Sequence, residues 1–99
     1  MKTPRWNAFL LVSTLSAATL PLHAADIIKA DNVDNLTLGS SWVGSTAPGL
    51  SDIAVWNNTV TAANTTLLGA NASWSGIRIA DPAGAVTINA GSTLTLGAG

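Results

Sequence analysis

The sequence predicts an all-β protein, a β-solenoid of short stacked strands that follows an N-terminal export signal. Three observations lead to this fold class. Apolar and polar residues alternate along much of the chain, which is the pattern of half-buried strands. Similar stretches recur around Gly39, Gly69 and Gly97, and such regular recurrence is typical of repeat architectures. Thr, Val, Ile, Asn, Gly and Ser are abundant, and these residues suit strands and turns.

Residues 1–25 have the features of a secretory signal peptide. Basic residues near the start precede an apolar stretch, Ala8–Leu22, and small residues precede the first acidic one. This order is that of a helical export signal, which we expect to be cleaved after Ala24 or Ala25. A membrane-spanning helix needs about 20 predominantly apolar residues. The stretch is shorter, is diluted by Ser and Thr, and is interrupted by Pro21, so we do not expect the mature part to span a membrane.

Composition excludes several classes of function. After the signal only Lys29 and Arg78 are basic, against five aspartates. The chain therefore has no basic patch to neutralise phosphates, and we expect no nucleic-acid binding. It contains no cysteine, which excludes disulfides, thiol redox chemistry and a cysteine-ligated zinc site. The single histidine, His23, lies beside the expected cleavage point, and we expect no catalytic role for it.

The part after the signal divides into a polar lead-in strand region, residues 26–38, and a region of strand repeats, residues 39–99. Three stretches of the chain resemble one another: Asn35–Gly39, Asn64–Ala70 and Ser92–Ala98. A second pair, Ser41–Gly44 and Ser73–Gly76, shares the order Ser-Trp-x-Gly. The interval between successive copies is roughly 30 residues, which favours a solenoid in which each coil stacks on the next.

Within each unit the local pattern is that of strands. Pairs of aliphatic residues two positions apart are expected to face the core: Ile77 with Ile79, Val86 with Ile88, and Leu94 with Leu96. The intervening polar residues would face outward. Asp81–Gly84 is expected to form a turn. An arrangement of the same strands as hairpins of a small sandwich is the alternative.

Landmarks in the second half resemble a known family. Trp42-Val43-Gly44, then Ala47-Pro48-Gly49, then Asp52–Trp56 are followed by Ser73–Ile77 and by Gly91–Gly97. This order resembles the N-terminal region of secreted bacterial proteins with autotransporter-associated β-strand repeats. The resemblance implies a right-handed parallel β-helix passenger on a bacterial cell surface, in chains that are usually very long. It provides no catalytic residues to carry over.

The resemblance covers Leu38–Gly97, and two departures from the family pattern stand out. The chain has about one leading unit with no repeat array after it. It also shows no terminal barrel strands and no hydrophobic sorting tail. We therefore expect these residues to be the first coils of a longer passenger, an incomplete fragment. Because repeat proteins usually need about three units, residues 25–99 alone are expected to be marginally stable or to aggregate.

Acidic residues of the lead-in could in principle bind Ca²⁺. Asp26, Asp31 and Asp34, with Asn32 and Asn35 between them, offer oxygen ligands. The spacing of an EF-hand loop and its glutamate are absent. A solvated polar strand is the favoured interpretation, and we predict no metal site.

Catalysis has even less material. Asp52 and Asp81 are the remaining carboxylates, and Arg78 is the one nearby cation. Glycoside hydrolysis needs two carboxyl groups that flank one bond, and a lyase needs a positioned base with charge stabilisation. We expect Asp52 and Asp81 to bind backbone amides of their turns instead. The sequence predicts no catalytic residue, no cofactor and no enzyme.

Trp42, Trp56 and Trp74 are the side chains with the strongest functional potential. Exposed indoles could stack on sugar rings, so these three are the candidate glycan-binding residues. Their alternative use is as large apolar groups that pack at the end of a solenoid, and the shared context of Trp42 and Trp74 favours packing. Four Asn-x-Ser/Thr triplets also occur, at Asn35, Asn57, Asn64 and Asn71; in a bacterial protein they reflect composition.

These observations predict a non-enzymatic, exported structural protein at the bacterial outer membrane or outside the cell. It would be the N-terminal part of an autotransporter-type passenger with an adhesion or scaffold role. Its expected partners are the export machinery, through the signal peptide, and cell-surface glycans. Two alternatives stay open: a carbohydrate-binding β module, and the non-catalytic start of a larger polysaccharide-acting β-helix enzyme.

Overall fold

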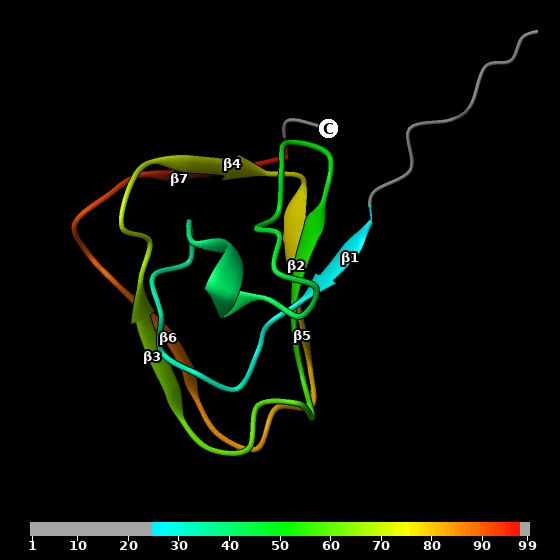
Figure 1. Cartoon of the computed structure of the whole chain (residues 1–99). Helices are drawn as coiled ribbons and strands as arrows, with labels where there is room; N and C mark the ends of the chain where they lie inside the picture. The colour runs from blue at the N-terminus through cyan, green and yellow to red at the C-terminus, as the bar shows by residue number, and fades with distance from the viewer. Residues whose placement is uncertain (1–24, 98–99) are drawn as a thin grey trace, which may run out of the picture.

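The computed structural model describes residues 25–97, which form short strands and one turn of 3-10 helix (Figure 1). The strands are β1 (Asp26–Ile28), β2 (Ile53–Asn57), β3 (Asn64–Leu67), β4 (Ala72–Trp74), β5 (Gly76–Ala80), β6 (Val86–Asn89) and β7 (Leu94–Leu96), and the 3-10 turn is η2 (Gly39–Ser41). The described chain is thus all-β, as the alternation predicts. The predicted signal peptide and its cleavage point after Ala24 lie outside the described residues.

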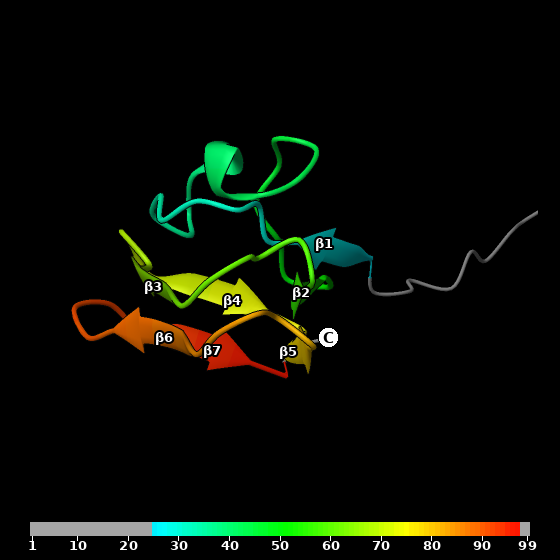
Figure 2. The same ribbon diagram turned by 90° about the horizontal axis from the view of Figure 1, so that it is seen from below.

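Every pair of neighbouring strands is parallel and belongs to a different turn of the chain. Strands β1, β2 and β5 form one sheet in that order, β3 pairs with β6, and β4 pairs with β7. Figure 1 shows these sheets as the sides of a triangle, and Figure 2 shows the turns stacked on one another. This is a β-solenoid with a partial first turn, a middle coil (β2–β4) and a last coil (β5–β7). Parallel pairing rules out the sandwich of hairpins, since hairpin strands are antiparallel.

The pairing register defines the length of one coil. Ile53 pairs with Gly76, Asn64 with Val86, and Ala72 with Leu94. The interval along the chain within each of these pairs is clearly shorter than the interval between Gly39 and Gly69. The recurrence of the glycines is therefore not the length of a coil, and the prediction built on it is wrong in that respect.

The similar stretches that suggested the longer repeat occupy different places. The N–H of Leu36 donates to the carbonyl of Leu67 at 2.9 Å, and that of Thr37 to the carbonyl of Leu68 at 3.0 Å. The first copy therefore lies directly over the second. The third copy lies on another side of the triangle, where β7 pairs with β4. Composition repeats here, while position does not.

Side chains alternate between the core and the outer faces as predicted. The middle coil places Ala54, Trp56 and Trp74 in the core. The register puts Ile77 below Ala54, Ile79 below Trp56 and Leu96 below Trp74. Val86, Ile88 and Leu94 also pack against the core. The predicted inward pairs of the last coil are thus confirmed.

Residues 29–52 close one end of the solenoid, and we call them the cap. Lys29 and Trp42 form an antiparallel bridge, supported by a 2.8 Å bond from the Val43 N–H to the Ile28 carbonyl. In Figure 2 the cap with η2 lies over the coils on one side, and the last coil lies on the opposite side. The cap extends across residue 39, where the sequence pattern placed the start of the repeats.

The core lies beneath the cap and is centred on the middle coil. Its buried members are Leu36, Trp42, Ala54, Trp56, Val60, Leu68 and Trp74. Two of these residues belong to the cap, so the cap completes the core of the middle coil. Among residues 25–97 no helix has the length and apolar character that crossing a membrane requires.

Candidate functional site

The three candidate glycan-binding tryptophans form a buried cluster. Trp42, Trp56 and Trp74 expose 2%, 0% and 1% of their surface. Trp42 lies edge-on to both others, with ring centroids 5.5 Å from Trp56 and 5.7 Å from Trp74. Such T-shaped pairs stabilise beyond the area they bury. Sugar stacking needs an open ring face, and none is open here, so the structure favours the packing interpretation.

Buried polar groups connect this cluster to the cap. The Trp42 indole N–H donates to the Leu36 carbonyl at 2.8 Å. The Trp56 indole N–H donates to Asn64 Oδ1 at 3.0 Å, and Asn64 Nδ2 donates to the Asn32 carbonyl at 2.8 Å. A buried amide must satisfy its donors and acceptors. Asn64 does so by bridging the middle coil and the cap.

Lys29 is the unexpected member of the same network. It is fully buried, and its ammonium donates to the carbonyls of Ala30 and Asn32 at 2.9 and 2.7 Å and to Asn32 Oδ1 at 3.1 Å. Continuing the register of β1 on β2 places Lys29 on the core side, next to Trp56. Burial lowers the pKa of Lys29, and the charges of Asp34 and Asp31 partly oppose that shift. The charge is thus held by three oxygens that are not carboxylates.

The lead-in carboxylates hold the cap in place. Asp31 accepts from the Thr61 hydroxyl at 2.7 Å and from its backbone N–H at 3.2 Å, and these bonds lower the pKa of Asp31. Asp34 accepts from the Ser40 hydroxyl at 2.8 Å. Asp26 forms an exposed ion pair with Arg78 at 2.7 Å. Among residues 25–97 no three acidic or histidine side chains gather as a metal site would require.

The other acidic residues belong to turns. Asp52 accepts from the Gly49 N–H at 2.7 Å, which is the turn role expected for it. Asp81 has a positive φ of 68°, in the left-handed region that Asp tolerates better than most residues. The two carboxylates lie at different levels of the stack, because Asp52 belongs to the cap and Asp81 follows β5 in the last coil.

The triplet asparagines also have structural roles. Asn64 is the buried bridge described above. Asn57 Oδ1 accepts from the Thr59 N–H at 2.9 Å, and Asn71 Oδ1 accepts from the Thr93 N–H at 2.8 Å. Asn35 lies against Gly69, where a side chain on the glycine would approach it to 2.8 Å. This contact, together with a φ of 86°, explains why position 69 is glycine.

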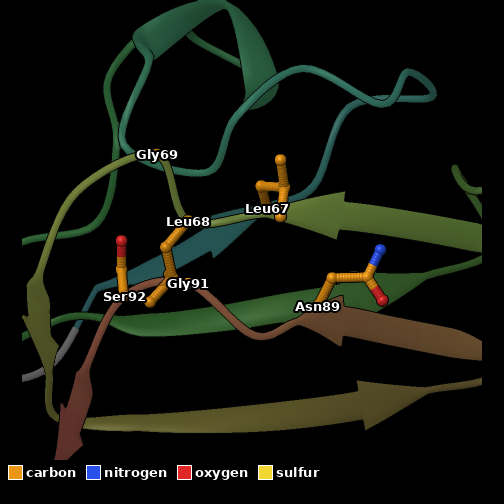
Figure 3. A pocket seen from close by; sticks show the side chains of 6 residues that line it. All are labelled: Leu67, Leu68, Gly69, Asn89, Gly91 and Ser92. Carbon is orange, nitrogen blue, oxygen red and sulfur yellow. The ribbon is translucent and has the colours of Figure 1, made fainter.

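A small open pocket lies at one corner of the triangle, where β3 leads to β4 and β6 leads to β7 (Figure 3). Its volume is about 210 Å³, and its lining residues are Leu67, Leu68, Gly69, Asn89, Gly91 and Ser92. Ligand pockets are typically larger and contain convergent polar groups. No titratable side chain lines this pocket, so it provides no acid, base or charged group for chemistry.

The largest functional feature is the end of the solenoid away from the cap. Ile77, Ile79 and Leu96 point toward the core, yet they are 37%, 54% and 47% exposed. Within residues 25–97 no strand pairs with the free edges of β5, β6 and β7. The alternation predicted that these side chains face inward. Their exposure depends on which coil is last, which the pattern alone does not specify.

Comparisons of the chain with models of protein families, with curated proteins and with solved structures found no match.

Proposed function

We propose that this chain is a non-enzymatic, exported structural module: the N-terminal cap and first coils of a right-handed parallel β-helix of the autotransporter-passenger type. The observation that carries the proposal is the difference between the two ends of the solenoid. One end is closed by the cap, which buries Lys29 and Trp42. The other end exposes aliphatic side chains and free strand edges. A cap of this kind terminates a solenoid in one direction and permits coils to follow in the other.

The chemistry of the described residues supports a structural role. The carboxylates of Asp31, Asp34 and Asp52 accept hydrogen bonds that fix the cap and its turns. The pocket contains no titratable group. Catalysis needs a nucleophile or base with an orienting group, and the described side chains with such potential are already used for folding. The module would act as a scaffold for adhesion at the cell surface.

Export is the part of the proposal with a direct test. The full chain would be expressed in a Gram-negative bacterium, and the periplasmic and secreted fractions analysed by N-terminal sequencing. We expect a processed product that begins at Ala25 or Asp26. An arginine in the apolar stretch, Leu11→Arg, should block processing because the translocated segment must be apolar. The control Thr3→Arg adds the same charge to the already positive start and should be processed normally. An unprocessed cytoplasmic chain would contradict the proposal.

A further inference from the structure

The open end of the last coil carries an apolar surface that we call the floor. It consists of the six inward aliphatic side chains of β5, β6 and β7, namely Ile77, Ile79, Val86, Ile88, Leu94 and Leu96. None of the three strands has a charged residue on this side. Arg78, the one charged residue within them, faces outward and pairs with Asp26. The floor is therefore an uncharged aliphatic patch, of the kind that marks an interaction site.

The floor is bordered by hydrogen-bonding groups. Within residues 25–97 the edges of β5, β6 and β7 that face away from the middle coil are unpaired. An unpaired edge readily binds another strand. A partner for the floor must therefore present both aliphatic side chains and strand edges of its own.

We propose that the floor is a self-association surface on which two copies of this chain pair end to end about a twofold axis. A second copy offers the required partner chemistry, an equal uncharged floor with three free edges. Stacking of a floor on the opposite end is blocked, because the cap covers that end and its buried Lys29 occupies the position of an inward ladder residue. Association must then stop at two copies rather than grow into a filament. The inference concerns the chain as it stands and does not depend on export.

The direction of the strands is compatible with this pairing. When two identical coils face each other, the chain runs around one in the sense opposite to the other, so the facing strands are antiparallel. An axis through the middle of β5 places β5 on β5 of the second copy and β6 on β7 of the second copy. The first match joins strands of equal length, and the second joins strands that differ by one residue. The other two axes would place β5, the longest of the three strands, on a shorter one.

The size of the surface is also adequate. Stable protein interfaces typically involve about 20–30 residues on each side. The last coil, which runs from Gly76 to Gly97, is of comparable length. Each copy would bury its floor and satisfy its strand edges in one step.

The first test measures the oligomeric state of the full chain by sedimentation velocity over a wide range of concentrations. We expect a reversible monomer–dimer equilibrium with no larger species. Ile79→Lys places an ammonium in the middle of the floor and should weaken dimerisation at least tenfold, while circular dichroism shows the same β content. The matched control Leu67→Lys changes a similarly exposed leucine on an outer face and should dimerise normally. A wild-type monomer at all concentrations, open-ended growth, or equal dimerisation by Ile79→Lys would overturn the proposal.

The second test examines the pairing of strands by cross-linking. The chain has no cysteine, so Thr87→Cys in β6 and Thr95→Cys in β7 each provide a single thiol. Facing residues of antiparallel strands lie about 5 Å apart, within reach of a disulfide. Oxidation of an equimolar mixture should yield mainly the mixed dimer. Cross-linking of each variant mainly with itself would show a different interface and overturn the assignment. Neither result bears on processing of the signal, so failure here is distinguishable from failure of the proposed function.

Discussion

At the scale of single residues, Lys29 shows how the cap tolerates a buried charge. Its ammonium makes three hydrogen bonds to oxygens, so every proton of the group has an acceptor. Removing an ion from water still costs free energy, and that cost is why burial lowers the pKa of Lys29. The same residue opposes edge pairing at this end, since an inward charge is one way in which proteins protect a sheet edge.

The lowered pKa of Lys29 predicts how stability depends on pH. Between the folded pKa and the ordinary value of 10.5, the unfolded chain binds more protons than the folded chain. The free energy of unfolding should therefore rise with pH across that window. The sequence contains no Tyr and no Cys, so few other groups titrate there. Urea unfolding at a series of alkaline pH values should show the rise in the wild type and its loss in Lys29→Met. An unchanged slope in that variant would assign the effect to another group.

At the scale of elements, β3 contains one imperfect position. Thr66 points into the core and is 3% exposed, and its hydroxyl has no hydrogen-bond partner. A buried polar group without a partner destabilises the folded state by about 1–3 kcal/mol. Valine has nearly the same shape and needs no partner.

We therefore expect Thr66→Val to raise the free energy of unfolding by about 1 kcal/mol. The matched control is Thr65→Val, which makes the same change at the exposed neighbouring position of β3 and should have an effect within about 0.5 kcal/mol. Urea denaturation of both variants measures the difference. Equal effects would mean that strand propensity accounts for the gain.

The corner between β5 and β6 lies close to the corner above it. A Cβ at Gly84 would overlap the backbone nitrogen of Ala63, whereas a Cβ at Gly76 would contact nothing within 4 Å. We expect Gly84→Ala to destabilise the fold by about 1–3 kcal/mol, since the backbone must shift to relieve the overlap. Gly76→Ala is the control and should be close to neutral. Thermal unfolding of the two variants would test this, and equal melting temperatures would show that the corners separate freely.

Predictability from sequence also differs between kinds of element. The inward direction of Ile77 and Ile79 could be predicted because alternation along a strand is a local property. The length of a coil could not, because stacking is set by long-range backbone pairing, and similar segments such as Asn35–Gly39 and Ser92–Ala98 occupy different sides of the solenoid. Burial of Lys29 was missed because charged side chains are usually solvated. Its acceptors come from the conformation of the cap, which no local pattern specifies.

At the scale of the whole molecule, stability should vary along the stack. In a solenoid each coil contacts only its neighbours, so its stability depends on how many of its surfaces are covered. The middle coil lies between the cap and the last coil, and it contains Trp56, Trp74 and the Asn64 bridge. The last coil has one neighbour, and its floor is open. The two coils have similar strands, so the difference between them arises from position.

This gradient predicts the order of hydrogen exchange. At concentrations too low for dimerisation, amides of β6 and β7 should exchange at least tenfold faster than those of β2 and β3, because local opening of the last coil exposes fewer buried groups. Exchange followed by NMR resolves the strands separately. When the concentration is raised, a dimer that covers the floor should slow exchange in β6 and β7 selectively, while Ile79→Lys should keep their exchange fast. Uniform rates in both coils at low concentration would instead mean that the cap, the middle coil and the last coil unfold as one cooperative unit.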